Sequence, residues 1–586
     1  MFKNQPAGLY VLALANTGER FGYYTMLAIF LFFLQAKFGF DATWTGQIFS
    51  IFLALVYFMP VLGGWLADRW SFNKCVLTGI AVMFVGYALM SAPTPVRSNT
   101  SFMILLAALL LIATGTGLFK GNLQVMVGDL YNNPRYSDRR DSAFSLFYMA
   151  INLGSMFAPG AAIALKNLAL NKAGFLTNNP MAATVSNWCL DTDGFTNMPT
   201  DPETLKNMSD FAVKNGMEQG GDLAAWLTTY LQNFAGECSA QFGNMVEFAD
   251  GYISAFSTGC TYAFSLACAS LIVSFLIYTL GRTTYKHIIT DAPKQPVAGK
   301  QTAAVNNGPE LTPEQTKQRV VALFLVFAVV IFFWMVFHQN GQTLTEFAKS
   351  CTAPESSSWT RIGFNLGALT AIAAGVYAFF GFIQSKTAKG KTISGLILAV
   401  CAGIVIWIYT GVLPETLTNI DPAAYQQFNP FFVVALTPFS LALFSWLNAK
   451  KKEPSAPRKI GYGMIVAGVA YLVMVFGSLS LVGTNGDVST NWLITTYLLL
   501  TFAELLLSPM GISFVSKVAP PKLKGAMMGG WFAATAVGNY LVSIPMLLWG
   551  KIDVWAIWSI LIVLCLLSAA FIFSQMKKLE AATGDA

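Results

Sequence analysis

Long apolar runs separated by short polar stretches dominate this chain. An apolar run near 20 residues is long enough to cross the hydrocarbon core of a bilayer as a helix. By that measure the sequence predicts about fourteen spans. They are expected near residues 10–35, 45–67, 74–92, 102–127, 141–165, 256–281, 319–345, 361–384, 391–413, 429–448, 459–483, 491–513, 523–549 and 553–575. The pattern therefore predicts an all-α polytopic membrane protein.

Two long polar stretches divide this pattern. Residues 282–318 are rich in Pro, Lys, Gln and Asn, and they predict a cytoplasmic linker between an N-terminal bundle of six helices, residues 1–281, and a C-terminal part, residues 319–586. A second stretch, residues 166–255, is polar overall but contains tryptophans and a helical pattern from Asp222 to Phe234. We expect it to form a small ordered cap outside the membrane, whose role the sequence leaves open.

Composition and charge agree with a membrane location. The chain of 586 residues is 55% hydrophobic and only 11% charged, whereas soluble domains carry about 25% charged residues. Lys and Arg gather in every second loop, which predicts cytoplasmic N- and C-termini. The net charge of +7 thus reports topology and indicates no affinity for nucleic acid. The expected location is a bacterial inner membrane, with no cleavable signal peptide and the lipid bilayer as surroundings.

Cysteine and histidine usage limits the chemistry. Eight cysteines are scattered without metal-ligand spacing, so neither a metal nor a cofactor is expected. Cys189 and Cys238 both face outside on this topology, and a disulfide and two free thiols remain alternatives. No Ser-His-Asp order or phosphate loop can be assembled from the sequence, which argues against an enzyme.

An acid and a base lie inside the first apolar run. Glu19 and Arg20 share one helical face with Asn16 and Tyr23, because these positions follow a spacing of three, four and seven residues. A charged side chain at mid-bilayer costs about 2.5 to 3.5 kcal/mol on translocon scales. Ionisable residues inside a span therefore indicate a site or pathway, and we expect this face to point into the protein.

Several motifs resemble those of the proton-dependent oligopeptide transporters, a branch of the major facilitator superfamily. Glu19-Arg20-Phe21-x-Tyr23-Tyr24 resembles the first-span signature, and the segment from Phe144 to Ser155 resembles the fifth. Further matches follow in order through both halves. They are Gly115–Asn122, Phe333–Gly341, Asn429-Pro430 with Pro438, Ala503–Gly511 and Lys524–Phe532.

The resemblance implies a fold and a transport mechanism. Two six-helix bundles would alternately open a central site to each side, and a proton gradient would drive uptake of small peptides. The substrate-binding residues so implied are Arg20, Tyr23, Tyr24, Tyr57, Lys120, Asn152, Trp334, Glu504 and Trp531. Arg20 and Lys120 would face a peptide carboxylate and Glu504 its ammonium group, because burying either charge unpaired is expensive. A monomer is expected.

The chain departs from the family pattern at positions that bear on coupling. Asn16 stands where a glutamate is usual, Leu27 where an arginine is usual, and His338 where the seventh span usually has a glutamate. The proton carrier therefore stays open. The candidates for proton coupling are Glu19, Arg20, Lys120, His338 and Glu504. A neutral, hydrogen-bonded His338 in the helix interface is the alternative for that residue.

Two further features follow from the resemblance. Asp68 and Arg69 end a Gly63-Gly64-x-Leu66-Ala67-Asp68-Arg69 segment similar to the loop motif of the superfamily, which implies a gating role at the cytoplasmic edge. The apolar segments within residues 361–413 lie between two motif-bearing spans and carry no site motif, so they predict a hairpin outside the twelve-helix core.

Three functions remain after this reading. The leading one is a proton-coupled symporter of di- and tripeptides. The others are an uncoupled or differently coupled carrier of another small anion or peptide-like compound, and a receptor that senses its substrate without concentrating it. Asn16 and His338 are the residues that favour the last two.

Overall fold

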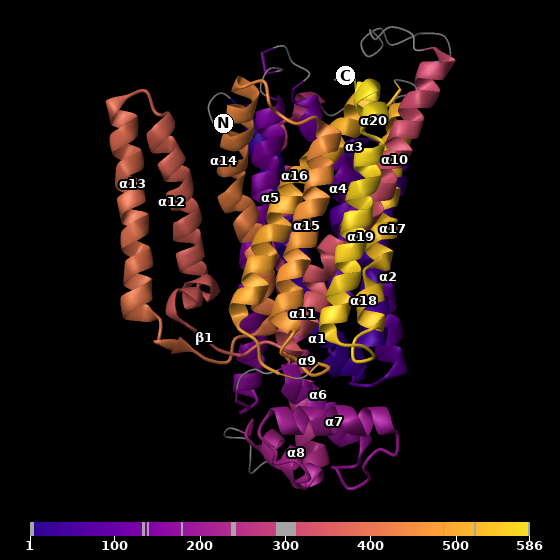
Figure 1. Ribbon diagram of the computed structural model, residues 1–586, viewed down its shortest axis with the longest axis vertical. Helices are drawn as coiled ribbons and strands as arrows, with labels where there is room; N and C mark the ends of the chain where they lie inside the picture. The colour runs from indigo at the N-terminus through magenta and orange to yellow at the C-terminus, as the bar shows by residue number, and fades with distance from the viewer. Residues whose placement is uncertain are drawn as a thin grey trace.

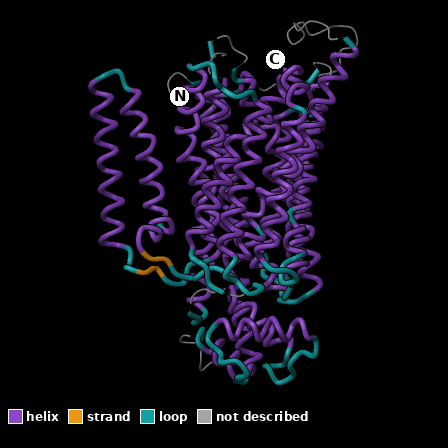
Figure 2. Tube along the Cα trace, viewed as in Figure 1, coloured by secondary structure: helices purple, strands orange, loops and turns teal. Residues whose placement is uncertain are grey.

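The protein is described here from a computed structural model, shown in Figures 1 and 2. The structure describes residues 5–131, 135–136, 140–176, 180–235, 242–288, 312–484, 486–520 and 523–583. Most of the expected linker therefore lies outside the described residues. Long helices lie side by side along one axis, and a group of short helices covers one end of them (Figure 1).

Six long helices form the N-terminal part. They are α1 (Ala7–Phe38), α2 (Ala42–Arg69), α3 (Phe72–Ser91), α4 (Asn99–Asp129), α5 (Arg140–Lys172) and α9 (Met245–Leu280). Helix α9 begins about three turns before the expected span. Asn244 caps it there by accepting a hydrogen bond from the Glu247 amide at 2.9 Å. The polar stretch between the fifth and sixth spans is shorter than predicted, since α5 also continues to Lys172.

The C-terminal part begins with α10 (Pro313–Phe337). A capping box between Thr312 and Gln315 stabilises the first turn of this helix. A 3-10 turn, η5 (His338–Gly341), and α11 (Thr343–Ser350) continue it. The other helices are α14 (Phe428–Ala449), α15 (Ala456–Ser478), α16 (Thr490–Val518), α17 (Lys524–Leu541), α18 (Ser543–Leu547), α19 (Val554–Ser574) and α20 (Met576–Thr583). The expected seventh span is thus one α-helix that breaks at His338.

Thirteen of the described helices are long and apolar enough to cross a membrane. Helix α17 is not among these thirteen; its 18 residues include a lysine, an asparagine and four glycines. Both ends of the chain lie at the same end of the bundle (Figure 1), which requires an even number of crossings. The all-α architecture is confirmed, and thirteen of the fourteen expected spans correspond to candidate membrane helices.

Helices α12 (Leu366–Gln384) and α13 (Ala388–Trp407) form a hairpin that stands beside the bundle in Figure 1. Helix α12 packs against α14 of the bundle, and its first residue, Leu366, also lies against Gly160 of α5. A short antiparallel pair, β1 (Ser356–Ser357) and β2 (Thr416–Leu417), closes the base of the hairpin, drawn orange in Figure 2. The expected hairpin is therefore present, and most of the α13 side chains are exposed.

Three short helices make the cap at the bottom of Figure 1: α6 (Pro180–Asp191), α7 (Pro202–Lys214) and α8 (Leu223–Gln232). Aspartates start the last two, because Asp201 and Asp222 accept hydrogen bonds from the amides of Thr204 and Ala225. We call the end of the bundle next to these helices the outer end.

Buried apolar side chains gather in two main clusters. One is built almost entirely from residues 9–285 and the other from residues 322–579. A site between the two parts therefore lies between two separately packed cores, and polar side chains there need partners from each other or from a ligand.

Candidate functional site

The charged pair of α1 is buried, as its helical face predicted. Asn16, Glu19, Arg20 and Tyr23 are each at most 3% exposed. Arg20 donates to both carboxylate oxygens of Glu19, with Nη2 at 2.5 Å from Oε1. The guanidinium also lies 4.9 Å from the centre of the Tyr23 ring. Arg20 therefore already has a carboxylate partner next to it in the chain.

Lys120 on α4 has a different environment. Its Nζ lies 4.3 Å from the centre of the Tyr57 ring of α2. Among the residues that the structure describes, no carboxylate forms an ion pair with Lys120. Lys120 is thus a cation of the N-terminal part whose close contact is with an aromatic face.

A close helix crossing fixes the position of α4 against α2. A Cβ at Gly63 would lie 2.2 Å from the Gly117 carbonyl oxygen, and a Cβ at Gly117 would lie 2.5 Å from Met59. Asn122 then donates to the Gly63 carbonyl at 3.2 Å. Lys120 follows Gly117 by three residues, so this crossing sets the depth at which its ammonium group lies.

Glu504 on α16 is the corresponding anion of the C-terminal part. It is 7% exposed and accepts hydrogen bonds from Tyr148 of α5 at 2.8 Å and from Asn429 of α14 at 3.0 Å. Asn429 also donates to Thr501 at 3.0 Å. Both partners of the carboxylate are neutral, and within the described chain no cation pairs with it.

Tyrosines connect the two charged groups across the interface. Tyr24 and Tyr57 each lie within electrostatic range of both Arg20 and Glu504. Lys120 lies within the same range of Arg20 and Glu19. The structure therefore brings Arg20, Lys120 and Glu504 to one central region, with aromatic side chains between them.

His338 completes the aromatic part of this region. Its ring stacks on Trp334, with centres 4.8 Å apart and planes 20° apart, and lies 5.6 Å from the Tyr57 ring. Its Nδ1 lies 2.5 Å from Oδ1 of Asn539 on α17. The buried indole Nε1 of Trp334 makes no hydrogen bond to the described residues.

The remaining expected residues lie in simpler settings. Asn152 donates to the Tyr148 carbonyl within its own helix at 3.0 Å, and the Trp531 ring packs against Gly511. At the other end of the bundle, the Arg69 guanidinium lies 3.8 Å above the exposed Trp65 ring. The side chain of Asp68 lies outside what the structure describes. The gating role of Asp68 and Arg69 stays a prediction.

The outer end joins the two parts through paired charges. Lys166 of α5 forms an ion pair with Asp421 of η8 (Pro422–Gln427 and its cap), and both side chains are almost fully buried. Gln35 of α1 donates to Glu346 at 2.9 Å, and Lys349 donates to Gln35 at 2.8 Å. Lys349 and Glu346 are themselves 2.9 Å apart.

The cap is attached to both parts as well. Asn187 of α6 donates to the Gln35 and Ala36 carbonyls at 3.1 and 3.0 Å. Lys214, the last residue of α7, lies 3.1 Å from Asp487, in the connection between α15 and α16. One cap helix therefore holds the end of α1, and the next holds the C-terminal part.

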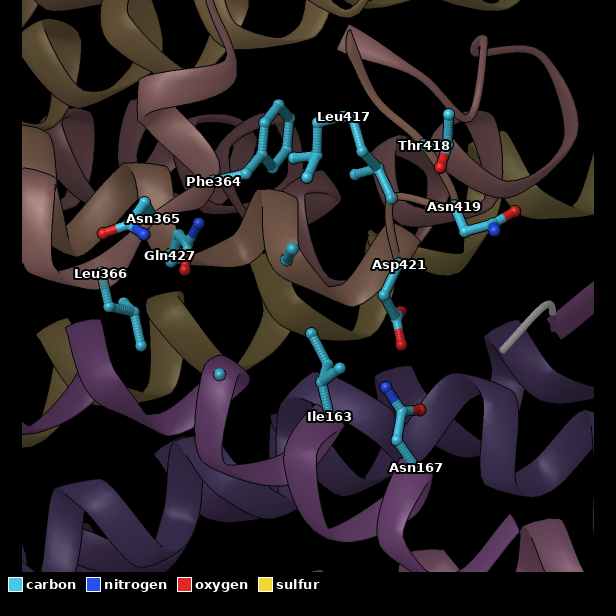
Figure 3. A pocket seen from close by; sticks show the side chains of 13 residues that line it. Ile163, Asn167, Phe364, Asn365, Leu366, Leu417, Thr418, Asn419, Asp421 and Gln427 are labelled. Carbon is cyan, nitrogen blue, oxygen red and sulfur yellow. The ribbon is translucent and has the colours of Figure 1, made fainter. Parts of the chain in front are cut away.

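The described cavity does not lie at the central charges. It measures about 320 Å³ and lies at the outer end, between α5, the base of the hairpin and η8 (Figure 3). Asp421 and Asn167 point toward one another on one side of it (Figure 3). The cavity therefore adjoins the Lys166–Asp421 pair and is separate from the candidate site.

Cys189 is a free, buried thiol in the cap, and Cys238 lies outside the described residues. The Sγ of Cys189 lies 3.4 Å from the Met245 carbonyl oxygen. Burial raises the pKa of the Cys189 thiol to about 11. Of the two alternatives for Cys189, the free thiol is the one observed.

Comparison with known proteins identifies the relatives of this arrangement. The sequence pattern of the POT family matches residues 73–181 and 403–555, one segment in each part of the chain. The chain is similar to the POT family over these two segments. The resemblance drawn from the motifs is therefore confirmed.

Curated relatives cover nearly the whole chain. It is 29% identical to an uncharacterised transporter, YclF, of Bacillus subtilis (strain 168), over 92% of this chain and 87% of the relative. It is 25% identical to a di-/tripeptide transporter of Lactococcus lactis subsp. lactis (strain IL1403), over 92% of this chain and 88% of the relative.

Solved structures establish the fold. A crystal structure of a peptide transporter, POT, in complex with sulfate aligns with a TM-score of 0.63 at 20% identity, over 99% of this chain and 96% of that one. The major facilitator fold expected from the sequence is thereby confirmed. Another aligned crystal structure, with a TM-score of 0.58 and 19% identity, is of a tetrameric relative, and it covers 98% of this chain and 99% of its own.

Two residues that contact Glu504 lie in motifs identified in the sequence, but they were not predicted as site residues. Tyr148 and Asn429 hold Glu504, although their motifs were noted for other positions. Asn539 was missed entirely. A lone asparagine inside an apolar span is a signal that could have identified it, because buried polar groups in membranes need partners.

Proposed function

We propose that this protein is a proton-coupled symporter of di- and tripeptides that works by alternating access. One observation carries the proposal. Lys120 and Glu504 are opposite charges on the two parts of the chain, and their close described contacts are an aromatic ring for the former and neutral donors for the latter. A zwitterionic ligand would supply a carboxylate to the first and an ammonium group to the second, which offsets the cost of burying both charges.

The aromatic side chains suit a ligand with variable side chains. Tyr24, Tyr57 and Trp334 offer apolar faces, and the Trp334 Nε1 is a buried donor without a described partner. Such a donor would gain a hydrogen bond from a peptide carbonyl. Tyr23, Asn152 and Trp531 would complete the walls of this site.

The arrangement of contacts between the parts supports alternating access. The two ion pairs that join them in the described chain, Lys166–Asp421 and Lys214–Asp487, both lie at the outer end. We infer that the structure represents a state closed at that end. Residues 1–281 and 319–586 would rock against each other as two bundles, with hairpin 361–413 outside them and with Asp68 and Arg69 acting at the opposite end.

The remaining proposals concern surroundings and assembly. Both termini would be cytoplasmic in a bacterial inner membrane, and protons would enter through the group of Glu19, Arg20, Lys120, His338 and Glu504. We propose a monomer as the transporting unit. Cross-linking in native membranes would test this, because the aligned tetrameric relative offers the contrary expectation.

Uptake of labelled dialanine into proteoliposomes tests the function. We expect accumulation above the outside concentration only with an inward proton gradient. N-acetyl-dialanine and dialanine amide each lack one charge and serve as matched controls, and both should compete poorly. Equilibration without accumulation would contradict coupling, and absence of any dialanine uptake would contradict the substrate.

A second candidate is a non-peptide zwitterion. A crystal structure of a POT family transporter in complex with 5-aminolevulinic acid aligns with this chain with a TM-score of 0.64 at 18% identity, over 99% of this chain and 98% of that one. That compound also carries one ammonium and one carboxylate group. Uptake of labelled 5-aminolevulinic acid without uptake of dialanine would favour this candidate.

A further inference from the structure

Asn539 is a fully buried polar residue near the C-terminal end of α17, and its side-chain oxygen lies 2.5 Å from Nδ1 of His338. An amide oxygen only accepts hydrogen bonds, so Nδ1 of His338 carries the hydrogen in this contact. In a neutral imidazole the other nitrogen, Nε2, then has the free lone pair. The hydrogen bond therefore selects one tautomer and leaves Nε2 as the atom that can accept a proton.

The neighbours of His338 hold its ring in one orientation. Trp334 stacks on one face at 4.8 Å, Phe337 lies edge-on at 5.3 Å, and Tyr57 lies 5.6 Å away on the N-terminal part. An imidazole so packed rotates only at the cost of these contacts. Asn539 and the aromatic rings together therefore present Nε2 in a fixed direction.

One charged side chain acts on this ring. Lys120 lies within electrostatic range of His338, and its ammonium group contacts the same Tyr57 ring that His338 contacts. The other close neighbours, Tyr57, Trp334, Phe337 and Asn539, are neutral, and within the described chain no carboxylate pairs with His338. A nearby cation disfavours an imidazolium.

We propose that Asn539 is a positioning residue that presents Nε2 of His338 as the proton acceptor of the central site, and that Lys120 makes this protonation depend on a bound substrate carboxylate. The inference rests on the proposed function. A carboxylate that pairs with Lys120 cancels the repulsion, and His338 then takes a proton from water at Nε2. Linkage is reciprocal, so the protonated site also binds the carboxylate more tightly.

The first test compares two ligands across pH. Binding of dialanine and of dialanine amide to the purified full-length protein is measured between about pH 5 and 8, where a histidine titrates. We expect dialanine to bind more tightly as the pH falls, with uptake of protons from a weak buffer. The amide lacks the carboxylate, and its weaker binding should not depend on pH in this way.

The second test changes the positioning residue. Asn539→Asp keeps the acceptor and adds a negative charge, so the midpoint of the pH dependence should move upward by about one to three units. In a His338→Gln background the same substitution should cause no shift. Thr535→Val, one turn earlier on α17 and also buried, is the matched control and should leave the midpoint unchanged. Asn539→Ser provides a second variant if the aspartate folds poorly, and it should lower the midpoint.

Each outcome decides the matter. An unchanged midpoint in both Asn539 variants, or a shift in Asn539→Asp that persists without His338, would overturn the positioning role. Equal pH dependence for dialanine and its amide would overturn the link through Lys120. If the unmodified protein binds dialanine at no pH, the proposed function fails and this inference fails with it, whereas pH-independent binding of dialanine overturns only the inference.

Discussion

The outer end and the centre of this protein use charge in opposite ways. At the outer end, Lys166 meets Asp421, and Lys349 meets Glu346, with Gln35 joining the latter pair to α1. At the centre, Glu19 and Arg20 pair with each other within α1, but Lys120 and Glu504 contact only neutral partners among the described residues. Paired charges hold two surfaces together, whereas charges without an opposite partner await a ligand that brings one.

This difference explains how one interface can be both closed and ready to bind. A buried pair is expensive to break, since removal of one partner leaves an uncompensated charge. A buried charge without an opposite partner favours binding of a ligand that supplies that opposite charge. The outer contacts therefore set which side is open, and the central charges set what is taken up.

The largest expected effect comes from breaking the buried outer pair. Asp421→Ala leaves the fully buried Lys166 side chain without its carboxylate partner. We expect a loss of about 3–5 kcal/mol in the stability of this closed form. Thermal unfolding in detergent should show a lowered Tm, and a cysteine-labelling assay at the outer end should show greater access.

An apolar pair provides the control for that experiment. The double variant Lys166→Met with Asp421→Leu removes both charges, and it should recover much of the lost Tm, because buried ion pairs are often replaceable by apolar residues. If Asp421→Ala alone left both Tm and labelling unchanged, the outer end would not depend on this pair.

The next effect concerns the central charges. Lys120→Gln should weaken dialanine binding by about 10- to 100-fold, since hydrogen bonds to charged groups contribute about 1.5–3 kcal/mol. Binding of dialanine amide should hardly change, because it has no carboxylate. Glu504→Gln should weaken binding of the ligands that carry an ammonium group, dialanine and dialanine amide. Binding of N-acetyl-dialanine, which has no ammonium group, should not change. Equal losses for charged and blocked peptides in isothermal titration would contradict the assignment of the two ends.

A smaller effect is expected where helix packing supports the centre. Gly63→Ala would place a Cβ against the Gly117 carbonyl and push α2 away from the helix that carries Lys120. We expect a loss of about 1–3 kcal/mol in stability and weaker dialanine binding. Gly64→Ala is the matched control, because nothing lies within 4 Å of its added Cβ. Similar Tm values for the two variants would refute the close crossing.

The smallest effect is expected at an exposed pair outside the spans. Arg458 donates to Glu580 at 2.6 Å, and this hydrogen bond holds the pKa of the Glu580 carboxyl below its usual value. Its stabilisation is therefore present above the usual pKa and is lost as the pH falls through the lowered one. Glu580→Gln should lower Tm slightly at neutral pH, and the difference from the unmodified protein should shrink in acid. A large Tm change would show that exposed pairs matter more here than solvent screening allows.

Local pattern was enough for much of the fold. Apolar run lengths gave the spans within a few residues, because a helix in lipid must satisfy its backbone internally and must match the bilayer. The break at His338 was not foreseen, although the polar run His338-Gln-Asn-Gly-Gln-Thr343 could have indicated it, and the structure forms η5 and α11 there. Helix α9 was predicted too short, because its polar first turns lie in the cap and outside the apolar run.

The sequence by itself determined the membrane class, the positions of most spans, the buried charged face of α1 and the resemblance to the POT family, because each depends on residue type and spacing along one helix. Only the tertiary structure decided which buried polar side chains pair with one another. Nothing in the chain order pairs Lys166 with Asp421, Tyr148 with Glu504, or His338 with Asn539. Those contacts join residues more than 200 positions apart, and in a buried site the partner of a charge decides whether it holds the protein together or binds a ligand.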